Sequence, residues 1–296
     1  MKFNTVAIAA LAGVASASPV EMRQNGGGDG PFGPGTYKTE SSLQQHTIYM
    51  PTKSTDSTKL PVLVWGNGAC SADGRSNVQL LQQIASYGYL AISSGGPGQQ
   101  GSTTAKMMTD SIDWAVANAG KGDYANVDVT KIMAAGFSCG GVEAYAQIWD
   151  SRVSTVGIFS SGLLDNQTAA THFDKPILYV LGGQSDIAYA NVSFHPVHPT
   201  TPPPSLFPVS NIWLAQGERD FKSLPANTPA WKGNINVGHG GTLNDQNGGK
   251  FGKAGLNWLQ YIFRGDEQAK AYLTGGYQAD GWAVETHAFD QLKPIV

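Results

Sequence analysis

The residues with the clearest chemical meaning stand together as Gly136-Phe137-Ser138-Cys139-Gly140, which match the pattern G-x-S-x-G. A β-like run at 131–137 precedes the serine, and a helix-like pattern at 141–151 follows it. In this context the serine lies at a sharp turn, and the flanking glycines let the strand and the helix approach closely. The pattern predicts Ser138 as a nucleophile, with a plain glycine-rich turn as the alternative.

A serine hydroxyl is a weak nucleophile and needs a base, which a carboxylate in turn orients. For a site of this type the chain order is serine, acid, histidine. Asp186 follows an apolar strand-like run, and His239 lies in a glycine-lined loop after the last expected strand. We therefore expect Ser138, Asp186 and His239 to act together. Asp165 and Asp220 are the alternatives for the acid.

The other histidines fit this order less well. His46 precedes the serine, His172 precedes the acid, and His287 follows the expected closing helix. His195 and His198 lie in a proline-rich stretch with no acidic or cysteine partner nearby. We expect no metal site there, because zinc-type sites need such partners.

Acyl transfer also needs two backbone N–H groups that point at the developing oxyanion. One comes from the residue after the serine, Cys139, and the other from the loop after an early strand, where Ala69 is the expected donor. Cys70 adjoins Ala69, so the two cysteines of the chain flank the same expected oxyanion hole. We expect a Cys70–Cys139 disulfide that joins the loop to the turn. Two reduced, buried cysteines are the alternative.

Strand-like and helix-like segments alternate along the chain and must position these residues. An antiparallel pair is expected at 35–43 and 46–51, and further strands at 60–68, 89–96, 131–137, 154–162, 175–183 and 231–238. Helical spacing predicts helices at 76–88, 107–120 and 141–151, and one long closing helix at 255–273. This alternation predicts an α/β fold with a mostly parallel central sheet and helices on both faces.

The composition is that of an ordinary globular protein. The length of 296 residues and the hydrophobic content of 41% allow one large core, so we expect a single domain at 36–296. The net charge of −3, with no basic cluster, argues against nucleic acid as a partner. No apolar run approaches the length of a membrane span.

The N-terminus predicts secretion. Residues 1–17 resemble a signal peptide, with Lys2, an apolar run at 6–15 and a cleavage site at Ala15-Ser16-Ala17. A buried N-terminal helix is the alternative. Secretion to the extracellular space permits a disulfide. Residues 18–35 are rich in glycine and are expected to be a flexible leader. Asn166-Gln167-Thr168 is a sequon for N-glycosylation.

Residues 192–216 break the alternation, because they are proline-rich and have no periodicity. A long structureless loop is uncommon inside a compact domain. The codons of Val192, Ser210-Asn211 and Gln216 are compatible with the donor, branch-point and acceptor signals of a short intron. We expect a retained intron in the gene model. A substrate-gating insertion and a neutral or disordered surface loop are the alternatives. If the segment is a retained intron, Asn191-Val192-Ser193 is a sequon only by accident.

The chain from about residue 59 onward resembles the α/β-hydrolases of the dienelactone hydrolase and chlorophyllase-like group, which includes secreted cutinase-like polyester hydrolases. The likeness rests on PVLVWGNG, LLQQIASYGYLAIS, AAGFSCGG, the acid after LYVLGG, GHGG and the C-terminal WLQYIFRGDEQAKAYL. It implies the α/β-hydrolase fold and acyl transfer on esters by Ser138, Asp186 and His239. It also implies a substrate-binding role for Leu163 in the cleft wall. The cysteine after the serine departs from the polyester hydrolases.

The expected protein is therefore a secreted serine esterase that acts as a monomer on an ester substrate and needs no cofactor. Two rival functions stay open. One is a non-catalytic secreted protein that uses the same fold for binding. The other is cleavage of amide or carbon–carbon bonds by the same three residues, which the fold alone does not exclude.

Overall fold

The computed structural model describes residues 26–53, 57–164, 167–189 and 217–295. The strands are β1 (Gly35–Lys38), β2 (His46–Pro51), β3 (Leu60–Gly66), β4 (Leu90–Ser94), β5 (Val127–Phe137), β6 (Val153–Phe159), β7 (Ile177–Leu181), β8 (Ala230–Asn234) and β9 (Ala283–His287). The α-helices are α1 (Val78–Ser86), α2 (Ala105–Asn118), α3 (Cys139–Tyr145), α4 (Gly217–Lys222), α5 (Gly249–Arg264) and α6 (Glu267–Thr274).

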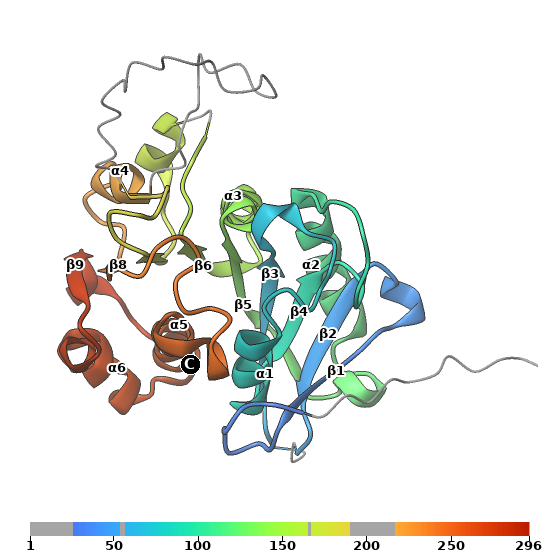
Figure 1. The fold of residues 1–296 in the computed structure, drawn as a ribbon. Helices are drawn as coiled ribbons and strands as arrows, with labels where there is room; N and C mark the ends of the chain where they lie inside the picture. Colours follow the sequence, from blue (N-terminus) through green and yellow to red (C-terminus); the bar gives the residue numbers. More distant parts are fainter. Residues whose placement is uncertain (1–25, 54–56, 165–166, 190–216, 296) are drawn as a thin grey trace, which may run out of the picture.

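The described strands form one nine-stranded sheet in the order β1-β2-β4-β3-β5-β6-β7-β8-β9 (Figure 1). The neighbours from β4 to β8 run parallel, whereas β1, β2 and β9 join the sheet in antiparallel pairs. The prediction of an α/β fold with a mostly parallel sheet is confirmed, including the antiparallel pair at its start. Parallel strands have their carboxyl ends at one edge, so the loops after β3, β5, β6, β7 and β8 meet there.

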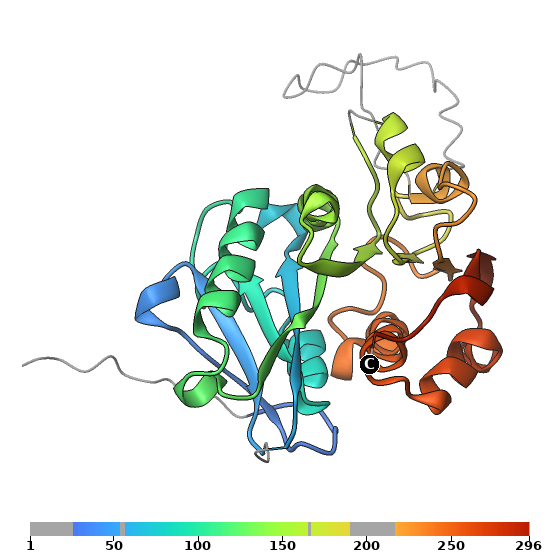
Figure 2. The same ribbon diagram turned by 180° about the vertical axis from the view of Figure 1, so that it is seen from behind.

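Helices cover both faces of the sheet, as Figures 1 and 2 show. Alternate side chains of β3 enter two different cores. Leu63 and Trp65 pack with side chains of α1, α5 and α6, whereas Val62 and Val64 pack with side chains of α2, α3 and α4. Burial on both faces explains why β3 has a continuous apolar sequence rather than an alternating one.

The prediction of one long closing helix is wrong. The segment is divided into α5 and α6 at Gly265, which ends α5 in a left-handed conformation with φ of 63°. Asp266 then begins the next helix, because its side chain accepts hydrogen bonds from the N–H groups of Gln268 (2.8 Å) and Ala269 (2.9 Å). A left-handed glycine followed by a capping aspartate is a common way to end one helix and begin another.

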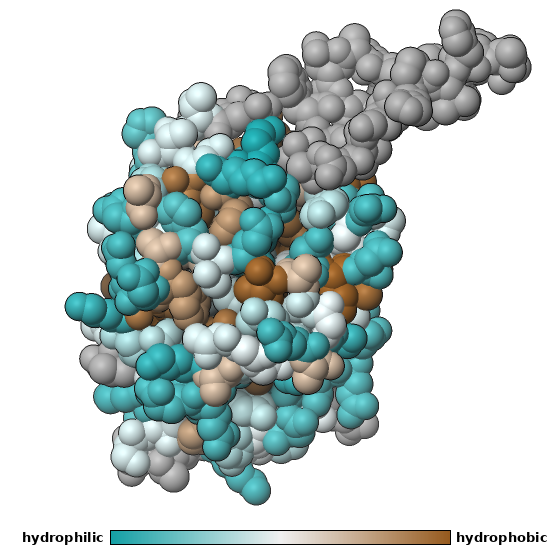
Figure 3. Space-filling view, turned by 90° about the vertical axis from the view of Figure 1, so that its left-hand side faces the viewer, coloured by the Kyte–Doolittle hydropathy of each residue, from teal (hydrophilic) through white to brown (hydrophobic). Residues whose placement is uncertain are grey.

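Strand β9 follows α6 and was not predicted from the sequence. It forms one edge of the described sheet, and its side chains are largely exposed. Figure 3, which views the molecule from this side, shows mostly hydrophilic residues with smaller apolar groups among them. Glu285 of β9 pairs with the buried Lys232 of β8 at 2.6 Å, which places a charge on the edge strand. Charged residues at such edges oppose pairing with other chains.

The last ten positions of the expected flexible leader, 26–35, make hydrogen bonds with each other and with α1. Gly27 exchanges two backbone hydrogen bonds with Gly35, and the N–H of Phe32 donates to the carbonyl of Ser86 at the end of α1 (3.0 Å). Asp29 exchanges hydrogen bonds with the side chain of Gln83. This segment has few apolar groups, but its glycines allow the backbone to pack directly on α1.

Several expectations lie outside the described residues. They are the signal peptide at 1–17 and the leader up to residue 25, the alternative acid Asp165, the sequon at Asn166, the sequon at Asn191, and residues 192–216 with His195 and His198.

Candidate active site

Ser138 occupies a strained turn between β5 and α3. Its φ and ψ are 53° and −118°, outside the conformations that residues with side chains usually adopt. The start of α3 lies so close to β3 that a Cβ atom on Gly140 would collide with the backbone of Gly66. Ser161, in the loop after β6, donates its hydroxyl proton to the Ser138 carbonyl at 2.6 Å. This is the strand–turn–helix geometry that the sequence pattern predicts, and it exposes the Ser138 hydroxyl at the carboxyl edge of the sheet.

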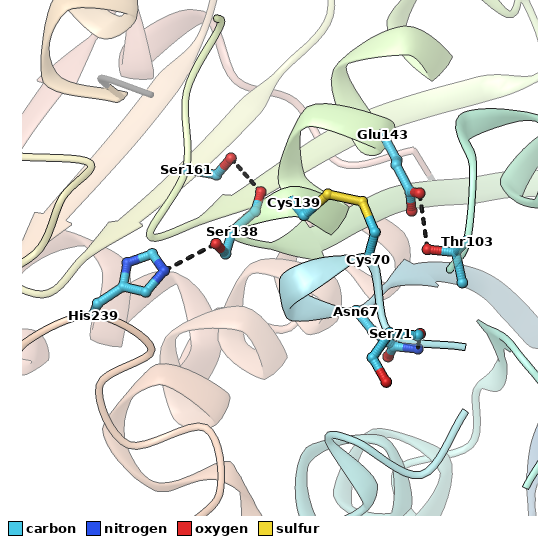
Figure 4. The surroundings of a disulfide bond; sticks show 9 residues. All are labelled: Asn67, Cys70, Ser71, Thr103, Ser138, Cys139, Glu143, Ser161 and His239. Atoms are coloured by element: carbon cyan, nitrogen blue, oxygen red, sulfur yellow. Dashed lines mark hydrogen bonds between the residues drawn. A yellow bond between two sulfur atoms is a disulfide. The ribbon is translucent and has the colours of Figure 1, made fainter. Parts of the chain in front are cut away.

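His239 and Asp186 complete a hydrogen-bonded series with Ser138. The Ser138 hydroxyl lies 2.9 Å from Nε2 of His239, and Nδ1 of His239 lies 2.8 Å from Oδ1 of Asp186. Figure 4 shows the histidine ring directed at the serine hydroxyl. The three residues come from the loops after β5, β7 and β8. The structure thus brings together the three side chains that the sequence predicts for acyl transfer.

Asp186 is fully buried, whereas the His239 side chain is 29% exposed. Burial alone raises the pKa of Asp186, but hydrogen bonds from His239, Ser160 and the N–H groups of Ala188 and Gly182 outweigh it and hold the pKa below its ordinary value. The carboxylate therefore stays ionised at neutral pH. An ionised carboxylate only accepts hydrogen bonds, so Nδ1 of His239 donates and Nε2 is free to accept the serine proton.

Asp220, an alternative for the acid, is buried elsewhere. Its carboxylate accepts hydrogen bonds from the Tyr145 hydroxyl (3.1 Å) and from the N–H of Leu163 (2.6 Å), and pairs with Arg219 (2.9 Å). Burial raises the pKa of Asp220 despite these partners. His239 contacts Asp186 instead, so Asp186 is the carboxylate placed to orient it.

Three other histidines of the described residues also bond away from the serine. His46 contacts the Met107 carbonyl (2.9 Å), His172 contacts Thr171, and His287 contacts the Thr228 carbonyl.

The loop after β3 contains the 3-10 turn Gly68–Cys70, in which Ala69 and Cys70 have φ of 54° and 48°. Asn67 organises this loop from a fully buried position. Its side-chain amide donates to the carbonyls of Ser71 (2.9 Å), Asp73 (3.2 Å) and Ser94 (2.7 Å). The backbone carbonyl of Asn67 accepts a hydrogen bond from the N–H of Gly140 (3.0 Å), which connects the loop to the turn that contains Ser138.

Cys70 and Cys139 form a disulfide with a Cα–Cα distance of 5.1 Å, as predicted (Figure 4). It joins the loop that carries Ala69 to the first residue of α3. The N–H of that first residue has no acceptor within its own helix, so the Cys139 amide is available to an oxyanion beside Ser138. The two expected donors, Ala69 and Cys139, therefore belong to segments that one covalent bond holds together.

Leu163 lies in the loop after β6, partly buried against the core that contains α2, α3 and α4. Its N–H donates to Asp220, and its carbonyl accepts from Arg219 (2.8 Å). The backbone at Leu163 is thereby fixed two residues after Ser161, which contacts the serine turn. Its expected role as a cleft-wall residue stays a prediction.

Sequence reasoning missed four residues around the serine. Phe137 packs its ring on that of His239, with 5.0 Å between centroids. Ser160 bonds both Asp186 and the N–H of Gly240. Asn67 and Ser161 position the two backbone walls, as described above. The signal that was available is their location, since each lies at the carboxyl end of a strand in the parallel part of the sheet.

The described residues contain no group of three or more His, Cys, Asp or Glu side chains arranged to hold a metal ion. None of the helices in these parts of the chain is both long enough and apolar enough to cross a membrane. No protein-family model matches the chain, and no curated protein matches it significantly. The interpretation of the site therefore rests on its geometry alone. A serine, a histidine and an aspartate form a hydrogen-bonded series at the carboxyl edge of an α/β sheet.

Proposed function

We propose that this chain is a secreted serine hydrolase that cleaves carboxylic esters, built as an α/β-hydrolase of the dienelactone hydrolase and chlorophyllase-like group. One observation carries the proposal. Ser138, His239 and Asp186 form a continuous hydrogen-bonded series with separations of 2.9 Å and 2.8 Å, although they are far apart in the sequence. A nucleophile, a base and a carboxylate that orients the base are the requirements of this chemistry.

In the proposed mechanism, Ser138 Oγ attacks the acyl carbon while His239 Nε2 takes its proton. Asp186 holds the imidazole in the required tautomer and stabilises the imidazolium that forms. His239 then gives the proton to the leaving alcohol. A water molecule, deprotonated by the same histidine, attacks the acyl-enzyme and releases the acid.

The proposed oxyanion donors are the backbone amides of Ala69 and Cys139. Both amides are held in place, because the disulfide joins their two segments and the side-chain amide of Asn67 donates hydrogen bonds within the loop. Donors held in place before the reaction stabilise the developing negative charge without reorganisation. This mechanism uses no cofactor.

Exposed apolar side chains on the loops that carry Asp186 and His239 support an ester with an apolar part as the substrate. Ile187 follows Asp186 and is 45% exposed, and Val237 precedes His239 by two residues and is 43% exposed. These two side chains lie on the acid and histidine loops, and Leu163 lies on the loop after the neighbouring β6. We propose that the acyl or alcohol group of the substrate contacts this surface.

Secretion is part of the proposal because the disulfide is compatible with an oxidising compartment and because residues 1–17 resemble a signal peptide. We further propose that the protein acts as a monomer, since all three side chains of the series and both proposed donors come from one chain.

The test combines a fluorophosphonate probe with a panel of chromogenic esters of varied acyl length and one matched amide. The wild-type protein is expected to form an adduct at Ser138 and to hydrolyse at least one ester, and Ser138→Ala is expected to do neither. Hydrolysis of the amide alone favours the rival chemistry on the same residues. A folded wild-type protein that forms no adduct favours the non-catalytic binding protein and refutes the proposal.

A further inference from the structure

The loop that carries Ala69 has a backbone conformation that does not persist without support. Ala69 and Cys70 are consecutive and both lie in the left-handed region, with φ of 54° and 48°. Residues with a Cβ atom avoid this region, so the surrounding structure must hold them there. The disulfide supplies one restraint. Apart from the hydrogen bonds of Asn67, a further non-covalent restraint comes from residues 101–103, which we call the strap.

The strap pairs with the loop in antiparallel fashion. The N–H of Thr103 donates to the Cys70 carbonyl at 2.7 Å, and the N–H of Ala72 donates to the Gly101 carbonyl at 3.1 Å. Ser71 and Ser102 form the bridge between these two bonds. The orientation of the Cys70 peptide group therefore depends on where Thr103 lies.

Thr103 is in turn anchored to α3. Its hydroxyl donates to Oε1 of Glu143 at 2.8 Å, and both residues are more than nine-tenths buried (Figure 4). Glu143 follows Cys139 by four residues, so both side chains lie on the same face of α3, one turn apart. Besides the bond from the Gly140 N–H to the Asn67 carbonyl, helix α3 thus holds the loop through the disulfide of Cys139 and, by way of the strap, through the bond from Thr103 to Glu143.

The carboxyl group of Glu143 is a costly choice for packing alone. Among the described residues, its Oε2 atom has no hydrogen-bond partner, and no basic side chain pairs with it. A buried carboxyl group without full pairing destabilises the folded state, whereas an apolar side chain would fill the same space without this cost. What Glu143 provides and an apolar side chain could not is an acceptor for the hydrogen bond from the Thr103 hydroxyl.

We propose that Thr103 and Glu143 are positioning residues that fix the Ala69 amide relative to the Cys139 amide. The inference rests on the proposed function, because these two amides are its oxyanion donors. The pair acts through the Cys70 carbonyl and does not contact the reacting atoms. Through this pair, helix α3, which begins directly after Ser138, also determines the position of the Ala69 amide.

The first arm of the test does not depend on catalysis. Amide hydrogen exchange of the segment 67–73 is measured in the wild type, Thr103→Val and Thr103→Ser, with Thr104→Val as the matched control. Thr104 is exposed and its side chain does not cap α2. We expect exchange to be at least about tenfold faster in Thr103→Val alone, because local opening controls exchange. Unchanged exchange in Thr103→Val overturns the inference.

The second arm measures kcat and KM on an ester that the wild type hydrolyses. We expect Thr103→Val and Glu143→Leu to lower kcat about tenfold, a fraction of the ~10²–10³ that loss of a donor costs, with KM unchanged within about twofold. Thr103→Ser and Glu143→Gln keep the donor and the acceptor and are expected to retain most of the activity. A wild-type kcat in Thr103→Val, or an equal loss in Thr104→Val, overturns the inference. A wild type without esterase activity and without a Ser138 adduct refutes the proposed function, and the exchange arm still decides whether the pair holds the loop.

Discussion

Gly182 and Gly238 are in direct backbone contact, and this contact joins the loop of Asp186 to the loop of His239. The N–H of Gly238 donates to the Gly182 carbonyl at 2.7 Å, and a Cβ atom on Gly182 would collide with the Gly238 carbonyl. The short distance between Asp186 and His239 therefore depends on a position that has no room for a side chain.

Gly182→Ala is expected to push the two loops apart. A displacement of about 1 Å in such a site can lower the rate about 10²-fold, so kcat/KM on an ester substrate should fall by that order. Gly275→Ala is the control, because a Cβ atom there meets nothing within 4 Å. Equal activities of the two variants would contradict the proposed role of the contact.

Asp186→Asn tests the orientation of the imidazole. An asparagine amide favours the wrong histidine tautomer, so kcat should fall by about 10³–10⁴ while the fold is retained. The control is Asp245→Asn, an exposed carboxylate on the loop that follows His239. Initial rates on a chromogenic ester and circular dichroism of both variants provide the measurement. If Asp186→Asn keeps wild-type kcat, a different residue orients the histidine.

The lowered pKa of Asp186 predicts that the free energy of unfolding decreases at acid pH. The unfolded chain takes up a proton at this residue near the ordinary value of about 4, whereas the folded chain does so only at lower pH. The stabilisation is therefore complete above about pH 4 and is lost as the pH falls through the folded pKa. We expect the free energy of unfolding of the wild type to exceed that of Asp186→Asn most at neutral pH, and the difference to shrink in acid. Urea titrations across this range measure it, and a difference independent of pH would contradict the prediction.

Reduction of the disulfide should lower both stability and activity. Cys70 and Cys139 are 69 residues apart, and a cross-link of that span stabilises by about 4 kcal/mol in the chain-entropy model. Thiol counting should find no free thiol in the native, unreduced protein. Thermal unfolding with and without a phosphine reductant gives the stability change, and the Cys70→Ser/Cys139→Ser variant controls for effects of the reductant. Two free thiols in the native protein would disprove the bond.

Asn67→Ala should destabilise the loop after β3. It leaves the carbonyls of Ser71, Asp73 and Ser94 without their amide donor, and unpaired buried carbonyls cost about 1–3 kcal/mol each. We expect a loss of at least about 2 kcal/mol in the free energy of unfolding, together with a lower kcat. Asn257→Ala removes a single local bond on the surface of α5 and should change neither quantity appreciably.

Much of the fold could be predicted because burial on both faces gives the parallel strands continuous apolar sequences. Strand β9 could not be predicted in this way, since an exposed edge strand carries a weak pattern. The break between α5 and α6 was missed because helical spacing continues through Gly265 and Asp266, although these two residues are a typical end and start.

The candidate site could be predicted where a residue type carries the chemistry. The serine motif, the order of acid and histidine, and the position of the cysteines each led to a side chain that the structure places in the series or beside it. Asn67, Thr103 and Glu143 have no such motif. Their contacts depend on the distance between loops that lie far apart in the sequence, and a single sequence does not give that distance.

The Cys70–Cys139 bond also bears on how the recombinant protein should be prepared. A chain made in the reducing cytoplasm of a bacterial host would lack the covalent attachment of the Ala69 loop and would keep only the hydrogen bonds around it. Poor turnover in such a preparation would therefore not distinguish incomplete oxidation from an inert serine, so protein produced in a periplasm or a secreting yeast is the appropriate starting material.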